Sequence, residues 1–165
     1  MTRDELFIEL CLSEALAAFE EDEVPVGAII VSPQEELIAK GRNQTIKLNS
    51  PIAHAEILAI QEAAKALDNY RLTGCTLYVT KEPCIMCAGA LIEARIQRVV
   101  FGCYDSKRGA LGSISHVNML PSNHRFEVTG GVLEMPCRGL LQKFFRMRRG
   151  TEVVITGPTR NRLYA

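Results

Sequence analysis

Apolar and polar positions change their spacing from one segment of the chain to the next, and each spacing predicts an element. Within residues 2–20, leucines and alanines recur at helical intervals among charged residues, which predicts an amphipathic helix. Residues 24–31 are apolar and rich in β-branched side chains, and residues 37–40 resume that pattern after a turn at 32–34. Two such runs joined by a short turn predict a hairpin.

The middle of the chain alternates between extended and helical patterns. An Ala-rich helix is expected from Pro51 to Leu67, with Ser50 as its N-cap and the proline in its first position. Because strands and helices alternate from here on, their connections are crossovers, and the fold class is an α/β sandwich. The further elements expected are a strand at 76–80, a helix from Pro83 to about Arg95, a buried strand at 98–102, a short strand at 126–128 and a last helix at 136–149.

Length and composition indicate one globular domain of the cytoplasm. With 165 residues, 47% of them hydrophobic and 23% charged, the chain has the ordinary balance of such a protein. No run approaches the ~18 apolar residues of a membrane span. The domain is expected over residues 1–149, followed by a tail over 150–165 without a clear pattern. Nothing marks the chain for secretion, so its six cysteines are expected to be reduced.

Charge is balanced overall but unevenly distributed. The formal net charge is zero, yet residues 1–23 hold eight acidic side chains and one basic one. Residues 143–162 show the reverse, with six basic side chains against Glu152 alone. A chain of zero net charge can therefore still present a basic face to phosphates.

Three residues have the chemistry and spacing of metal ligands: His54 and, thirty residues later, Cys84 with Cys87. A structural zinc site closes with four protein ligands, whereas a catalytic site uses three and leaves the fourth position open. A zinc ribbon would need a second Cys-x-x-Cys or His-x-His pair, and a redox-active pair would not need the His-x-Glu upstream. The pattern therefore predicts a catalytic zinc ion held by His54, Cys84 and Cys87.

Glu56, two residues after His54, is the predicted acid–base group. Residues at i and i+2 do not face each other inside a helix. Both can reach one pocket only if they stand at a helix start, because side chains lean toward the helix N-terminus. There Glu56 would take a proton from the attacking water and pass it to a ring nitrogen and then to leaving ammonia. His-x-Glu combined with Pro-Cys-x-x-Cys is typical of zinc nucleobase deaminases.

Longer stretches of the chain narrow the substrate, because they closely resemble the bacterial TadA family of tRNA-specific adenosine deaminases. That family makes inosine at the anticodon wobble position. The resemblance implies a three-layer α/β/α sandwich of the cytidine deaminase-like type, with a mixed five-stranded sheet and helices on both faces. It also implies one zinc ion per subunit, a tRNA anticodon stem–loop as partner, and a homodimer whose subunits border each other's active sites. The matching stretches are Glu23 to Ala28, Asn43, His54 to Glu56, Asn69 to Leu72, Pro83 to Ala90, Arg98 to Gly102, Asp105 to Ser113, Asn123 to Arg125 and Phe144 to Arg149.

The resemblance also implies roles for residues around the target base. Asn43 resembles the residue that hydrogen-bonds the base, while Val26 and the backbone around Ala55 would form walls of the same pocket. His116 and His124 are interpreted as structural.

Further positions resemble the family's RNA contacts. Asp105 is expected to meet ribose or backbone of the anticodon loop, and Lys107 and Arg108 to meet phosphate. Phe145 and Arg148, on the last helix, would contact flanking nucleotides. An unpaired loop base suits this chemistry, since it costs less to extrude than a paired one.

Two other functions remain open at this point. A free-base or nucleotide deaminase, acting on guanine or cytosine, would share the metal site. An inactive zinc-containing RNA-binding subunit would keep the ligands but has no need of Glu56. The chain also departs from the family pattern at Lys81, where relatives often have an apolar residue, and at Cys103 and Tyr104 before Asp105.

Overall fold

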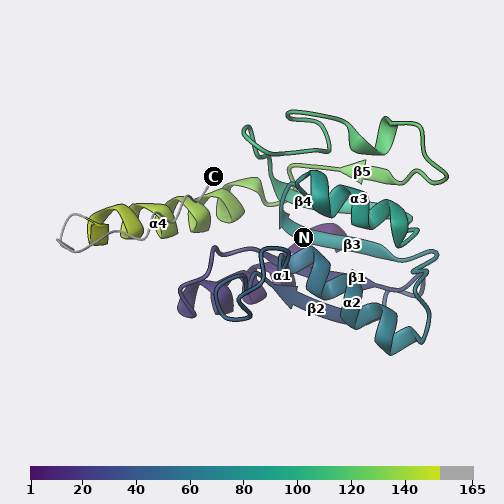
Figure 1. Ribbon diagram of the computed structural model, residues 1–165, viewed down its shortest axis with the longest axis horizontal. Coiled ribbons are helices and arrows are strands. Elements are labelled where there is room, and N and C mark those ends of the chain that lie inside the picture. Colours follow the sequence, from purple (N-terminus) through teal and green to yellow (C-terminus); the bar gives the residue numbers. More distant parts are fainter. Residues whose placement is uncertain (153–165) are drawn as a thin grey trace.

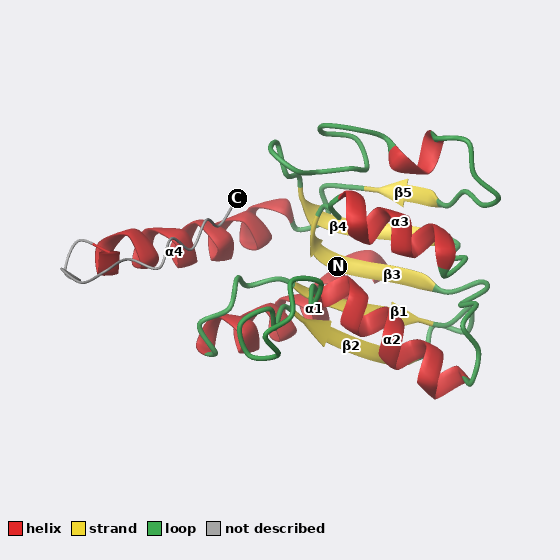
Figure 2. Ribbon diagram, viewed as in Figure 1, coloured by secondary structure: helices red, strands yellow, loops and turns green. Residues whose placement is uncertain are grey.

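Five strands form one mixed sheet in the order β2-β1-β3-β4-β5 in the computed structural model, which describes residues 1–152 (Figures 1 and 2). β1 pairs antiparallel with both β2 and β3, whereas β3, β4 and β5 run parallel to one another. The hairpin and the crossover connections predicted from the sequence are confirmed. The strands are β1 (Gly27–Val31), β2 (Leu37–Arg42), β3 (Thr76–Lys81), β4 (Arg98–Cys103) and β5 (Glu127–Thr129).

Helices cover both faces of the sheet, which confirms the expected α/β/α layering. α2 and α3 contact each other on one face (Figure 1), and α1 and α4 contact each other on the other. Two glycines allow the close approach: a Cβ at Gly27 would collide with the α1 backbone at Cys11, and one at Gly41 with the α2 backbone at Ala55. The helices are α1 (Arg3–Glu20), α2 (Ala55–Leu67), α3 (Ile85–Glu93) and α4 (Glu134–Glu152), with a 3-10 turn η1 (Val117–Met119).

Two helix starts differ from the sequence-based expectation, and both changes matter for the site. α2 begins at Ala55 and not at Pro51, because His54 has extended backbone angles and is the N-cap. The proline instead belongs to a turn, closed by a bond from Ala53 N–H to the Ser50 carbonyl at 3.3 Å. α3 begins at Ile85 and not at residue 83, with Cys84 as its N-cap.

The remaining differences are smaller. The strand expected from residue 24 begins at Gly27, and α4 begins two residues before Pro136 and continues to Glu152. The boundary expected at 149/150 therefore falls inside α4, while residues 153–165 of the predicted tail lie outside the described residues.

The core lies on both sides of the central strands. β1 is buried at all five positions and β4 at all but its first, as the apolar runs predicted. Cys11, Cys75, Cys103 and Cys137 are buried and form no disulfide, as expected, and the two predicted ligands Cys84 and Cys87 form none either. Within residues 1–152, no helix combines the length and apolar character needed to cross a membrane.

Candidate active site

The three predicted metal ligands come together where two helices begin. His54 caps α2, Cys84 caps α3, and Cys87 lies in the first turn of α3. Glu56 is the second residue of α2, so the requirement that His54 and Glu56 stand at a helix start is met. Both side chains line one cavity of about 400 Å³, here called the catalytic pocket. Free N–H groups at helix starts favour negative charge, which suits thiolate ligands.

The ligand atoms have the spacing of a tetrahedral zinc site. His54 Nδ1 lies 3.7 Å from Cys84 Sγ and 3.5 Å from Cys87 Sγ. All three atoms lie within 4.8 Å of one another. Zn–N bonds of ~2.0 Å and Zn–S bonds of ~2.3 Å at tetrahedral angles put such atoms about 3.5 Å apart. The donor set of one imidazole and two thiols therefore fits zinc in both chemistry and size.

The two cysteines differ in acidity because they lie against each other and against His54. Hydrogen bonds from Cys87 and from His54 lower the pKa of the Cys84 thiol to about 3, although burial opposes the shift. The same contact with Cys84, together with burial, raises the pKa of the Cys87 thiol. One thiolate is thus already present at neutral pH, and a divalent cation would favour ionisation of the second thiol.

Glu56 is buried beside these ligands and is only 4% exposed. Burial raises the pKa of its carboxyl group, against smaller lowering effects of its own backbone N–H and of His54. A carboxylate held in this way is a better base than one in water.

Asn43 brings unused hydrogen-bonding capacity to the same pocket. It follows β2, it is 8% exposed, and its backbone N–H donates to the Val26 carbonyl at 3.1 Å. Val26 and Asn43 both line the catalytic pocket. Among residues 1–152, the amide side chain of Asn43 makes no hydrogen bond. Because no fully buried polar side-chain atom among the described residues lacks a partner, this amide opens into the pocket, where a ligand can bond to it.

A loop over residues 105–113 closes one side of the pocket and is tied down by Glu82, which is 2% exposed. The Glu82 carboxylate accepts hydrogen bonds from the N–H groups of Asp105, Leu111 and Ser113 at 3.1, 3.0 and 3.1 Å, and from the Ser113 hydroxyl. A Cβ at Gly109 would lie 2.3 Å from the Glu82 Cδ, so only glycine leaves room for the carboxylate. Glu82 thereby fixes the position of Asp105 at the pocket.

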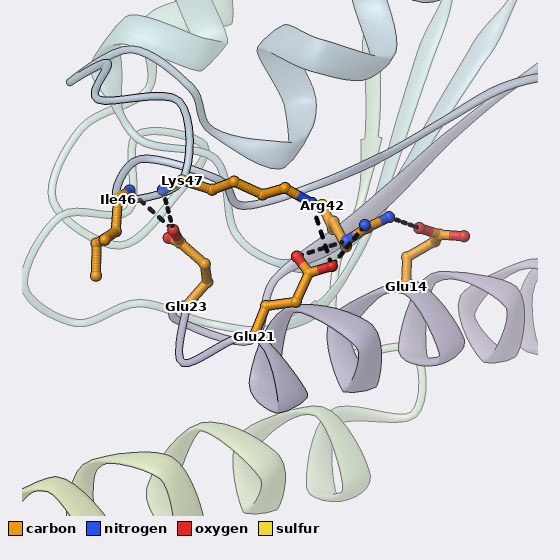
Figure 3. Close-up of polar contacts among 6 residues, drawn as sticks. All are labelled: Glu14, Glu21, Glu23, Arg42, Ile46 and Lys47. Carbon is orange, nitrogen blue, oxygen red and sulfur yellow. Dashed lines mark hydrogen bonds and ion pairs between the residues drawn. The ribbon is translucent and has the colours of Figure 1, made fainter.

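A second buried glutamate ties down the loop over residues 43–54. Glu23, 1% exposed, accepts from the N–H groups of Ile46 and Lys47 at 2.8 Å each (Figure 3). It also accepts from the Thr45 hydroxyl at 3.3 Å. This loop carries Asn43 at one end and His54 at the other. The neighbouring Glu21 pairs with Arg42, which fastens the end of α1 to the end of β2 (Figure 3).

A basic groove of about 850 Å³ adjoins the catalytic pocket. Asp105 and Phe145 line both hollows, whereas Lys107 and Arg148 line only the groove. The Arg148 guanidinium lies over the Phe144 ring at 4.9 Å and donates to the Asp22 carbonyl. Ala55 lines neither hollow, because its side chain is fully buried. The groove residues are Lys81, Lys107, Arg108, Arg138, Arg146, Arg148 and Arg149 as cations, with Asp105 among them.

Sequence reasoning missed three residues of this site. Glu82 and Glu23 stand inside recognisable motifs, but nothing in a motif shows that a carboxylate binds a loop backbone. Lys81 was noted only as a departure from the family pattern, yet its Nζ lies 3.0 Å from Asp105 Oδ2 and it lines both hollows. The sequence feature that could have identified these three residues is a charged side chain close to the apolar run of a buried strand.

Known proteins share this arrangement. The family model of the cytidine and deoxycytidylate deaminase zinc-binding region matches residues 1–103. A tRNA-specific adenosine deaminase of Bacillus subtilis is 48% identical over 152 residues, covering 90% of this chain and 92% of the relative. One of Haemophilus influenzae is 46% identical, covering 88% and 85%.

Solved structures agree with the sequence relatives. A structure from studies of A-to-I editing by tRNA:A34 deaminases at the wobble position of transfer RNA is 44% identical, with a TM-score of 0.79 over 81% of this chain and 97% of that one. The guanine deaminase of Nitrosomonas europaea is 26% identical, with a TM-score of 0.73 over 87% of this chain and 85% of that one.

Proposed function

The chain belongs to the tRNA-specific adenosine deaminases, and we propose that its catalytic pocket deaminates adenosine to inosine at the wobble position of a tRNA anticodon. The observation that carries this proposal is a cluster of three metal ligands, two of which line the catalytic pocket together with the buried carboxylate of Glu56 and the amide of Asn43. Each of these groups serves a separate requirement of hydrolytic deamination.

The metal requirement is met by His54, Cys84 and Cys87. When bound, zinc supplies the Lewis acidity that makes a water nucleophilic at neutral pH. The three side chains would hold the ion, because the fixed starts of α2 and α3 keep their ligand atoms at the observed separations.

Glu56 moves protons during the reaction. Its carboxylate lines the pocket beside His54 and accepts a proton from the attacking water. It donates that proton to the ring nitrogen. It then takes the second proton from the hydroxyl now bonded to the ring carbon and passes it to the amino group, so that the C–N bond breaks, a carbonyl forms and ammonia leaves. Burial of the side chain keeps bulk water from competing for the proton.

The target base is held by the pocket walls. The amide of Asn43 can donate to one base atom and accept from another, which gives orientation as well as affinity. Val26 packs against the base, and the backbone at Ala55, between His54 and Glu56, supports the same wall.

The basic groove receives the anticodon loop around that base. Its seven cationic side chains and single acid complement an RNA backbone. Lys107 and Arg108 meet phosphate, Asp105 meets a ribose, and Phe145 with Arg148 meets flanking nucleotides. Phe145 offers its ring at the point where the groove and the pocket join, where a base can stack.

A homodimer and a cytoplasmic location complete the proposal. Ile52 and Ile85 are 51% and 69% exposed and stand immediately beside the metal ligands. Exposed apolar side chains at a functional site indicate a surface that a second subunit covers. Light scattering of the purified protein at micromolar concentration tests the dimer.

A substrate comparison tests the reaction. Inosine formation is measured on an anticodon stem–loop with adenosine at the wobble position and, in parallel, ammonia release is measured on free guanine, cytosine and cytidine. We expect turnover of the stem–loop alone. Turnover of the free bases without the stem–loop would establish the alternative that the guanine deaminase likeness suggests.

Metal content tests the ligand assignment. Cys84→Ala removes one of three ligands and should abolish zinc binding and activity together. Cys103→Ala is the matched control, since that buried thiol is not in the ligand cluster and should keep one zinc per chain.

A further inference from the structure

Lys81 occupies the place where the catalytic pocket opens into the basic groove. It is the last residue of β3, and its side chain lines both hollows. The side chain is 27% exposed, so its stem is largely packed while its ammonium group reaches solvent.

Asp105 holds this ammonium group in place. Asp105 Oδ1 accepts the N–H groups of Lys107 and Arg108 at 3.0 and 3.1 Å, and Oδ2 lies 3.0 Å from Lys81 Nζ. Glu82 in turn fixes the Asp105 backbone. Both the side chain and the backbone of Asp105 are therefore held in place. A lysine that pairs with it loses much of its usual conformational freedom.

The ammonium group keeps capacity for a second partner. A lysine has three N–H donors and no acceptor. Among residues 1–152, Asp105 is the one ion-pair partner of Lys81, so donors remain for an anion. The surroundings favour a polyanion, because the groove has six further cations and no acid besides Asp105.

The position of Lys81 selects which part of the RNA it can reach. A nucleotide's phosphates are joined to its base through the ribose, so they lie just outside a cavity that encloses the base. The cations at the mouth of the pocket are thus the first that these phosphates meet. Lys81 differs from the other groove cations in being anchored on a strand end and not on a helix or loop.

Building on the proposed function, we propose that Lys81 binds the backbone phosphate adjacent to the target adenosine, with Asp105 as its positioning residue. The phosphate contact is made in both ground and transition states, so it lowers KM and leaves kcat nearly unchanged. It also releases counterions, which makes its contribution dependent on salt.

The experiment compares wild type, Lys81→Met and Lys81→Arg on the anticodon stem–loop across a series of salt concentrations. Lys81→Met should raise KM about 5- to 10-fold at low salt, with kcat within about twofold, since one charge-assisted hydrogen bond is lost. The slope of log KM against log salt should fall by about 0.7 to 1. Lys81→Arg should restore both values.

Lys65→Met is the matched control. Lys65 lies in the last turn of α2, at the far end from His54, and pairs with Glu62 in full exposure. The Lys65→Met substitution removes the same charge from the protein as Lys81→Met, and it should leave KM and the salt dependence of KM unchanged. An equal effect of both substitutions would mean that only net charge matters, and would overturn the proposal.

A second series separates phosphate binding from neutralisation of Asp105. If Lys81 only balances that charge, Asp105→Asn would abolish the effect of Lys81→Met, and the proposal would fail. We expect Lys81→Met to reduce the salt slope in the Asp105→Asn background as well. An active wild type with an unchanged slope in Lys81→Met overturns this assignment alone. A wild type inactive on the stem–loop overturns the proposed function, and the assignment with it.

Discussion

Glu56 and Glu82 are two carboxylates that line the same pocket and are buried to nearly the same degree, at 4% and 2% exposure, yet they are bonded very differently. Glu82, at the end of β3, receives four hydrogen bonds from the 105–113 loop. Glu56, at the start of α2, lies near its own backbone N–H and Cys87, and burial raises the pKa of its carboxyl group.

The difference shows how one residue type serves two purposes at one site. A carboxylate that accepts several hydrogen bonds from backbone N–H groups holds a loop in place. A buried carboxylate with few donors is destabilised as an anion and becomes a base. Burial alone therefore does not identify the catalytic group; the number of donors around it does.

Glu56→Gln should have the largest effect on turnover. The amide keeps the size of the side chain but cannot accept the proton, so kcat should fall by about 10²- to 10⁴-fold. Zinc content and the thermal midpoint should stay at or above wild-type values, because no buried charge remains to be desolvated. Single-turnover conversion of the stem–loop and metal analysis measure the two quantities. Loss of less than tenfold in kcat would show that another group carries the proton.

Glu82→Ala should have the opposite effect to Glu56→Gln, because it should lower stability more than turnover. Four donors lose their acceptor inside the protein, which should lower the free energy of unfolding by about 3 kcal/mol. Activity should fall as well, because Asp105 and the groove residues beside it lose their fixed position. Urea unfolding monitored by circular dichroism gives the first value. A variant as stable as wild type would mean that water replaces the carboxylate without cost.

The active-site ligands could be predicted from sequence because their spacing is local and their chemistry is selective. His54, Cys84 and Cys87 need only two helix starts to meet, and the condition that places Glu56 beside His54 follows from helix geometry. The α/β class also follows from alternating patterns. The predicted start of α2 was wrong because Ser50 and Pro51 form a plausible helix start on local grounds, whereas residues 45–49 form turns bonded to Glu23 and the helix begins only after the extended His54.

The loop anchors could not be predicted, because their partners are backbone N–H groups far along the chain. Glu82 binds residues 23 to 31 positions away, and no side-chain pattern records such contacts. The same holds for Lys81 and Asp105, which meet only when the loop has folded back. The roles of the RNA-contacting residues follow only from resemblance to the family, because no side-chain spacing in this chain specifies an RNA contact.

Glu23→Ala should resemble Glu82→Ala with a smaller effect. Three donors of the 43–54 loop lose their acceptor, but Ile46 and Lys47 are exposed and can bond to water instead. We expect a loss of about 1–2 kcal/mol in unfolding free energy and a raised KM, because Asn43 loses its fixed position. Glu21→Ala is the control: it removes a partly exposed ion pair with Arg42 and should cost less than Glu23→Ala, because solvent screens the pair. Equal losses in both variants would remove the anchoring role of Glu23.

Asp4, at the other end of the sheet, extends the comparison to a carboxylate near the surface. It receives both Arg98 nitrogens, at 3.0 and 2.7 Å, and the Tyr78 hydroxyl at 3.0 Å. The hydrogen bond from Arg98 is the main reason that the pKa of Asp4 lies below its ordinary value. A lowered folded-state pKa stabilises the protein above the unfolded pKa of about 3.9, and this contribution is lost as pH falls through the folded value. Asp4→Asn should therefore cost up to about 1 kcal/mol at pH 7 and progressively less below pH ~4, where wild type also carries a neutral group. Urea midpoints of both proteins between pH 7 and pH 3 measure the convergence. Parallel curves would show that the donors around Asp4 do not set its contribution to the free energy of unfolding. The relation between hydrogen-bond donors and the role of a carboxylate, seen at Glu56 and Glu82, would then hold only inside the pocket.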